Sequence, residues 1–389
     1  MGEAREVPVR RLWVSILCGY LALGATLQQL PGYLVERFDA GPVQVGTVVA
    51  AAFLATALTR PFAGRAGDLG FSRTLATVGA VTVVVAGVGH LAAQSIPELC
   101  VARLTMGVGE GALFSATLPW VIGGTPASRR GRVSGWFGLS MWSGLSIGPL
   151  LAGVAHWLGG DVAVWTTVIG LPVVSVILML TIDRSEHPTR WSRIFAVRPR
   201  ELIPPGVARP ALCLGLSAYG YGTLTALLIL YMSHPDLAGR GIALSIYAAS
   251  FLVARTIGSP LVDRCGAVKI AVGTLGIQAA GLTMIAVGST SALDLVGVVV
   301  TGIGVGSVYP AASAMTLQQS NAGNPGAAMG SMTSLWDLGI LVAGPIGGAI
   351  AGSSGFHWAF VVAAAAALAS CAIAAAQYVR PKSLTGERR

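Results

Sequence analysis

Two acidic side chains lie in the middle of long apolar segments, and the chemistry open to them there is proton exchange. Glu110 stands between two glycines in the run 109–111, and Asp337 stands in the run Leu-Trp-Asp-Leu-Gly at 335–339. A charged group at the centre of a bilayer costs about 2.5 to 3.5 kcal/mol on insertion scales, so it rarely faces lipid. Burial disfavours the charged form of a carboxyl group, so we expect both residues to carry protons. The alternative is a protonated carboxyl group that hydrogen-bonds a neighbouring helix.

Arg103 lies in the same apolar segment as Glu110. In a helix, positions 103, 107, 110 and 114 share one face, so both side chains can line one cavity. They are two turns apart, about 10 Å, which is long for a direct ion pair. We therefore expect Arg103 to bias the charge of Glu110 from a distance.

The composition indicates that these residues lie in a membrane. Hydrophobic residues make up 54% of the 389 positions and charged residues only 11%, against about 25% charged residues in soluble domains. A soluble fold of this size could not bury so much apolar surface. The net charge of +9 does not indicate a nucleic-acid partner, because the basic residues form no face with interleaved aromatic residues.

Signatures of an enzyme, a metal site or an ATPase are missing from the sequence. The five cysteines have neither metal-ligand spacing nor a disulfide framework. The five histidines are scattered, and no Gly-rich loop ends in Gly-Lys-Ser/Thr. We expect no enzymatic activity, no cofactor and no metal.

Apolar runs of roughly 20 residues predict membrane-spanning helices. The fold class we expect is an all-α polytopic membrane protein with twelve such helices, arranged as two six-helix halves around a central cavity. The expected domains are residues 1–182, a cytoplasmic linker at 183–209, and residues 210–389. The predicted helices are 13–35, 43–66, 74–93, 97–123, 133–158, 162–182, 210–232, 241–262, 268–288, 293–318, 326–350 and 356–379.

The distribution of Lys and Arg sets the expected orientation. With twelve helices, these residues concentrate in the termini and in the loops on the side of the termini. Only Arg37 and Arg240 fall in the opposite loops. Cytoplasmic loops carry such an excess of positive charge. We therefore expect a multi-pass protein of the inner (plasma) membrane with both termini cytoplasmic.

The two halves resemble each other when the sequence is shifted by 195 positions. Arg60 then falls on Arg255 and Asp68 falls on Asp263. The glycines at 107, 109 and 111 fall on those at 302, 304 and 306. Parallel repeats of this size are found in transporters that alternate access around a site near the midplane.

The segment after the second predicted helix resembles the loop signature G-x-x-x-D-R-x-G-R-R of the major facilitator superfamily. Gly64, Asp68 and Arg73 match this signature, whereas positions 69, 71 and 72 depart from it. The second copy keeps Asp263 and Arg264. The resemblance implies a gating latch, in which each carboxylate lies near the positive N-terminus of a helix from the other half. The alternative is an ordinary capped loop.

The fifth predicted helix resembles the antiporter signature of the same superfamily, G-x8-G-x3-G-P-x2-[small]-G. The matching residues are Gly135, Gly144, Gly148, Pro149 and Gly153. A glycine stripe with a proline kink gives a close, bent helix contact. The resemblance extends over nearly the whole chain. It is closest to the twelve-helix drug:proton antiporters, including the arabinose-efflux-type permeases, and it implies an exporter.

The same resemblance places predicted helices 1, 4, 7 and 10 around the substrate. Aromatic and amide side chains there suit an amphipathic organic molecule, although each aromatic residue could instead face lipid. We expect a small organic substrate, protons and the lipid bilayer as partners of a monomer. The candidate cavity residues are Gln28, Gln29, Tyr33, Phe114, Trp120, Tyr219, Tyr221 and Tyr309.

The leading interpretation is therefore a secondary active transporter that exports a small organic molecule in exchange for protons by alternating access. A proton-coupled uptake symporter is the alternative within the same class. A membrane sensor or assembly factor on a transporter-like scaffold is the alternative from another class, and no additional soluble domain supports it.

The topology can be tested with single cysteines placed near Asp236 and near Arg193. The two positions should react with a membrane-impermeant thiol reagent from opposite sides of the membrane, because an odd number of helices separates them. Reaction from the same side would contradict the twelve-helix topology.

Overall fold

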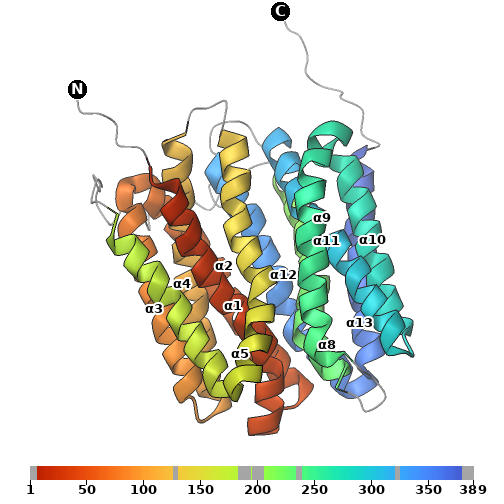
Figure 1. The fold of residues 1–389 in the computed structure, drawn as a ribbon. Helices are drawn as coiled ribbons and strands as arrows, with labels where there is room; N and C mark the ends of the chain where they lie inside the picture. Colours follow the sequence, from red (N-terminus) through yellow and green to blue (C-terminus); the bar gives the residue numbers. More distant parts are fainter. Residues whose placement is uncertain are drawn as a thin grey trace, which may run out of the picture.

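The computed structural model describes residues 7–125, 130–182, 194, 206–233, 239–319 and 325–378, and these ranges are helical apart from short connections (Figure 1). Ten unbroken helical stretches in the described residues are long and apolar enough to cross a membrane. Two of them, Pro42–Ala92 and Trp136–Leu180, each contain two crossings. The predicted twelve-helix, all-α fold class is thereby confirmed.

The helices keep close to their predicted ranges. The first group is α1 (Val9–Phe38), α2 (Pro42–Ala66), the π-helical turn η1 (Gly67–Phe71), α3 (Ser72–Ala92), α4 (Ile96–Gly123) and α5 (Arg130–Leu180). The second group is α8 (Ala208–Tyr231), α9 (Arg240–Cys265), α10 (Ala267–Val287), α11 (Ser291–Gln319), α12 (Pro325–Ser354) and α13 (Phe356–Tyr378). We refer to them as the N-terminal helices and the C-terminal helices.

Glycines reverse the chain inside the two double stretches. Gly70, in η1, has φ 88° and ψ 18°, which is left-handed backbone. Gly160 has φ 63° and ψ −154° and divides α5 into two crossings. Residues with a Cβ are strained in such conformations, which explains why glycine occupies both positions.

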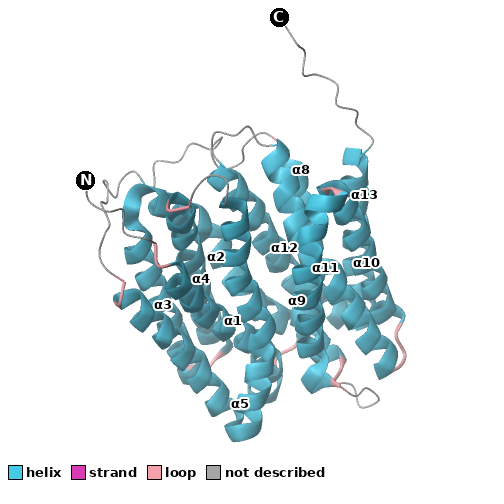
Figure 2. Cartoon of the chain, turned by 45° about the horizontal axis from the view of Figure 1, so that its top comes forward, coloured by secondary structure: helices cyan, strands magenta, loops and turns pink. Residues whose placement is uncertain are grey.

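The two groups of helices lie side by side (Figure 1). The start of α1 and the end of α13 are at the same end of the molecule, the top of Figure 1, which we call the terminal end. The view in Figure 2, with this end brought forward, shows the helices of both groups running between the terminal end and the opposite end.

The internal repeat of the sequence recurs in the packing. A Cβ at Gly107 of α4 would overlap the backbone carbonyl of Ala52 in α2. The equivalent Gly302 of α11 meets the carbonyl of Tyr247 in α9 in the same way, and both residues of this second pair are 195 positions further along. The repeated glycines are therefore sites where helix backbones touch, as is common in membranes.

Glycines also bring α2 and α12 together across the two groups. A Cβ at Gly46 would overlap the backbone carbonyl of Gly344, and one at Gly348 would overlap that of Pro42. These contacts lie toward the opposite end, at the start of α2 and late in α12. At this end the two groups meet backbone against backbone.

Replacement of Gly107 by Ala should destabilise the protein by about 1 to 3 kcal/mol, because the methyl group overpacks the α2–α4 contact. Gly170→Ala is the matched control, since a Cβ at Gly170 meets nothing within 4 Å. Thermal unfolding of the purified variants in detergent measures both effects. Equal stability of the two variants would contradict the packing described here.

Candidate functional site

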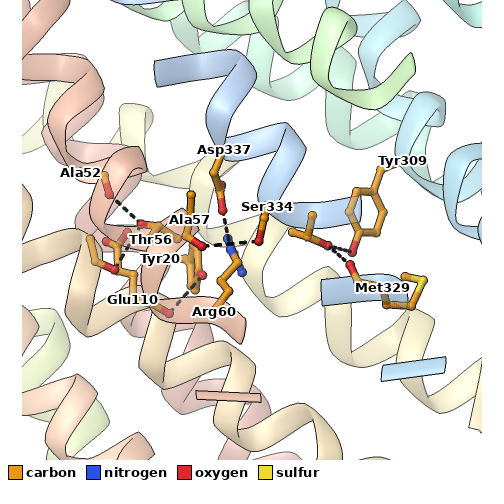
Figure 3. Close-up of polar contacts among 12 residues, drawn as sticks. Tyr20, Ala52, Thr56, Ala57, Arg60, Glu110, Tyr309, Met329, Ser334 and Asp337 are labelled. Carbon is orange, nitrogen blue, oxygen red and sulfur yellow. Dashed lines mark hydrogen bonds and ion pairs between the residues drawn. The ribbon is translucent and has the colours of Figure 1, made fainter. Parts of the chain in front are cut away.

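A buried ion pair joins the N-terminal and C-terminal helices. Arg60 Nε of α2 lies 2.6 Å from Asp337 Oδ2 of α12, with the two side chains only 7% and 2% exposed (Figure 3). Close by, Ser334 of α12 donates a hydrogen bond to the carbonyl of Ala57 in α2, at 3.4 Å. The pair is thus a polar contact in an otherwise apolar region between the two groups.

Glu110 of α4 lies beside this pair and is 1% exposed. The hydroxyl of Tyr20, in α1, donates to the backbone carbonyl of Glu110 at 3.3 Å. Thr56 of α2 donates to the carbonyl of Gly107 at 3.2 Å, one turn from Glu110. Helices α1, α2, α4 and α12 therefore converge on one polar centre (Figure 3).

A small cavity opens at this centre. Its volume of about 20 Å³ leaves room for about one water molecule. Both groups of helices contribute to its lining, which combines two carboxyl groups and one guanidinium group with aromatic side chains. The lining residues are Tyr20, Leu23, Phe53, Thr56, Arg60, Glu110, Met141, Trp142, Leu145, Tyr221, Thr333, Trp336 and Asp337.

A second cavity of about 20 Å³ adjoins the first and has an apolar, aromatic lining. The two cavities share Trp142, Leu145 and Tyr221. Its remaining lining residues are Leu27, Ser146, Pro149, Thr225, Leu244, Tyr247, Ala248 and Phe251. Together the cavities form a site with a charged end and an aromatic end.

Trp142 of α5 stands at the junction of the cavities and contacts the C-terminal helices. The Arg255 guanidinium carbon lies 4.8 Å from the centre of the Trp142 ring and 5.1 Å from that of Tyr309. Phe251 and Trp336 pack against the same indole at 5.1 and 5.5 Å. The arginine is 5% exposed, so its cation–π contacts are shielded from water.

Arg103 is fully buried but lies outside the residues that line either cavity. Its Nη2 donates to the carbonyl of Val49 in α2 at 2.7 Å, and its Nη1 contacts the sulfur of Met106 at 3.4 Å. In this structure Arg103 joins α4 to α2, and its influence on Glu110 stays a prediction.

The predicted substrate residues are spread over the molecule. Tyr221 lines both cavities, and Tyr309 stacks with Arg255 and hydrogen-bonds Thr333 at 3.3 Å. Tyr309 and the other six lie outside the two linings, and Gln29, one of the six, donates to Asp161 at 2.5 Å. Of the six, Gln28, Gln29 and Trp120 are half-buried, and Tyr219 is buried. Tyr33 packs on Trp165, and Phe114 packs on Tyr20.

The predicted latch is described only in part. Asp68 is exposed on η1, and Arg73 of α3 donates to the carbonyl of Leu180 at 3.3 Å. Arg264 is exposed at the end of α9, and Gly64 approaches the carbonyl of Ser115 in α4. The Asp263 side chain, the side chains at the start of α12, and most of the predicted linker 183–209 lie outside the described residues.

The glycines of the predicted antiporter helix divide into two kinds. Gly144 and Gly148 touch the backbone of α1 between residues 20 and 25, whereas a Cβ at Gly153 would meet nothing within 4 Å. Pro149 lines the second cavity, and the surroundings of Gly135 lie outside the described residues. The central part of the signature is thus an α1–α5 packing surface next to the site.

The site residues predicted from the sequence do not include Arg60, Arg255, Tyr20, Trp142 or Trp336. Two signals could have identified the arginines: each lies within an apolar span, where charge is rarely tolerated without a role, and the two are equivalent in the internal repeat. The aromatic residues had no comparable signal, because Trp and Tyr are also common at membrane interfaces.

In the part of the chain that the structure describes, membrane-length helices surround a buried, charged site between two related groups, an arrangement found in membrane transporters. The family model of the Major Facilitator Superfamily matches residues 12–237 and 210–389, so the chain belongs to this superfamily. It is 27% identical over 388 residues to an uncharacterized MFS-type transporter of Burkholderia mallei, covering 96% of this chain and 92% of the relative. It is 29% identical over 378 residues to one of Pseudomonas aeruginosa, covering 94% and 91%.

Solved transporters share the fold. A bacterial homolog of the human lysosomal transporter Spinster, in an inward-facing and occupied conformation, superposes with a TM-score of 0.73 at 12% identity, covering 98% of both chains. The human organic anion transporter MFSD10 gives a TM-score of 0.69 at 15% identity, covering 95% of this chain and 100% of the other. The nucleoside transporter NupG gives 0.70 at 12%, covering 96% and 100%.

The Arg60–Asp337 pair makes a double-mutant prediction. Arg60→Met and Asp337→Leu should each destabilise the protein by about 3 to 5 kcal/mol, because each leaves the partner charge buried alone. The double variant Arg60→Met/Asp337→Leu should recover most of this loss, and unfolding in mixed micelles measures all three. Additive losses in the double variant would contradict a direct pair.

Proposed function

We propose that the protein exports a small organic molecule in exchange for protons. The observation that carries this proposal is the cavity between the two groups of helices, which the described residues line with Glu110 and Asp337 but only one cation, Arg60. Asp337 is paired with Arg60, so ionisation of Glu110 makes the charge of the cavity lining net negative. A proton on Glu110 removes this charge.

Proton exchange at Glu110 would therefore alter the charge at the contact between the two groups. The adjoining aromatic cavity supports a substrate with an apolar body, whose polar part would lie near Glu110. Solved transporters of the same fold act on organic anions or nucleosides by their names, so the fold leaves the charge of the substrate open. The antiporter-like glycines of α5 favour exchange over symport.

The proposed setting is the bacterial plasma membrane. The terminal end faces the cytoplasm in this proposal, as the excess of Lys and Arg near it favours. The N-terminal and C-terminal helices act as the two halves of a monomer and rock about the central cavities. Asp68 and Asp263 would serve as latches at the terminal end.

Proteoliposomes with a pH gradient test the proposal with three probes: the organic cation ethidium, the organic anion fluorescein and the nucleoside uridine. An antiporter should concentrate its substrate in the acidic compartment, because protons leave that compartment as substrate enters. This result does not depend on the orientation of the protein. Protein-free liposomes control for passive movement. Accumulation in the alkaline compartment would instead indicate a symporter.

The role of Glu110 is tested by Glu110→Gln, which keeps the shape of the side chain and removes its titration. We expect loss of at least tenfold in concentrative transport, in line with the contribution of positioned acid–base groups, while exchange without a pH gradient persists. The control is Glu98→Gln in the exposed first turn of the same helix. Concentration of substrate to the parental level by the Glu110→Gln variant would show that Glu110 is not the proton carrier.

A further inference from the structure

The two buried arginine contacts at the centre of the molecule occupy equivalent places in the internal repeat. Arg60 and Arg255 are 195 positions apart, and so are their partners, Trp142 and Asp337. Arg60 of α2 pairs with Asp337 of α12, and Arg255 of α9 stacks on Trp142 of α5. The same arginine contact is therefore made twice, once with a carboxylate and once with an indole.

Both contacts join the N-terminal helices to the C-terminal helices. All four residues lie in the half of their helix, or of the first crossing of α5, that is nearer the terminal end. Any movement that opens the cavities toward that end must separate α2 from α12 and α5 from α9. Both arginine contacts have to break in this movement.

The two contacts differ in their response to protons. Protonation of Asp337 would remove one charge of the Arg60 pair, whereas the Trp142 indole has no group that titrates. Among the described residues, the titratable and charged side chains around Asp337 are Arg60, Glu110, Tyr20, Tyr221 and Tyr309. Tyr309 also faces Arg255. A cation–π contact that is shielded from water contributes about 2 kcal/mol, enough to matter for a conformational equilibrium.

We propose that Arg255 and Trp142 form a second lock on the terminal end, which holds the closed state regardless of protonation. Protonation acts on the charged centre formed by Arg60, Asp337 and Glu110, and Arg255–Trp142 sets the stability of the closed state that remains once that centre is weakened. Arg255 and Trp142 are positioning residues in this scheme. The contrast between the two locks rests on the proposed proton coupling, whereas the existence of the second lock does not.

The test measures access to the second cavity through a cysteine at Ser146, a residue that lines this cavity and is 4% exposed. The full chain with Ser146→Cys is placed in inside-out membrane vesicles, without substrate or pH gradient. A membrane-impermeant maleimide is added at a series of pH values. Each rate is divided by the rate of the same cysteine in the denatured chain at that pH, because the thiolate is the reacting form and its fraction falls with pH. Peptide mass spectrometry reads the rate at position 146 alone, so the native cysteines do not contribute.

Arg255→Gln should raise this rate about thirtyfold, and the rate should still rise as the pH falls. Asp337→Asn should also raise the rate and should reduce its dependence on pH to the part that Glu110 contributes, and Arg255→Lys should restore part of the closure. The matched control is Arg37→Gln, because Arg37 stacks on Tyr33 at 5.5 Å within α1 and does not bridge the two groups. This control should label at the parental rate.

A parental rate in Arg255→Gln would overturn the second lock, and loss of its pH dependence would overturn the independence of that lock from protons. If Arg255→Gln does not fold, Trp142→Phe provides the same test with a smaller increase, and a parental rate there has the same meaning. Failure of the proposed function has a different signature. The parental chain would then label independently of pH, or transport would run toward the alkaline side, while Arg255→Gln still labelled faster.

Discussion

The charge on Arg60 has to be balanced inside an apolar bundle, and this constraint organises the centre of the protein. The guanidinium group is shielded from water, and Asp337 of the other group of helices balances its charge. Two segments far apart in the sequence are thereby held in register. Glu110 and Thr56 lie at the same point because glycines let α4 approach α2 closely, and the Tyr20 hydroxyl reaches this point from α1.

The fold could be read from the sequence because its signals are long and redundant. Apolar runs, the distribution of positive charge and the repeat at 195 positions each favour the same twelve helices. The carboxylates at 110 and 337 were identified for a similar reason, since charge within an apolar span is conspicuous. The structure places both at one cavity.

The remainder of the site depends on which helix faces meet, and a single sequence does not reveal this. Arg103 and Glu110 share a helix face by spacing, yet Arg103 binds a carbonyl of α2 and lies outside the cavity linings. The sequence has no signal that distinguishes Trp142 and Trp336 from aromatic residues at membrane interfaces, whereas in the structure the two rings contact each other at the centre. Gln29 and Tyr33, in contrast, engage Asp161 and Trp165 away from both cavities. The positions of aromatic and amide side chains are decided by packing, which follows no simple periodicity.

The backbone contact between Gly46 and Gly344 gives α2 and α12 the geometry of a lever. Between Gly46 and Arg60 the helix is about 21 Å long, and the glycines touch at the end away from the ion pair. On α12 the distance from Gly344 to Asp337 is about 10 Å. A tilt of α12 by about 10° about this point therefore moves Asp337 by about 2 Å, which is enough to lengthen its 2.6 Å contact with Arg60 beyond hydrogen-bonding distance. Because α2 and α12 touch through two glycines, a small rotation of α12 about this contact is enough to break the Arg60–Asp337 pair completely.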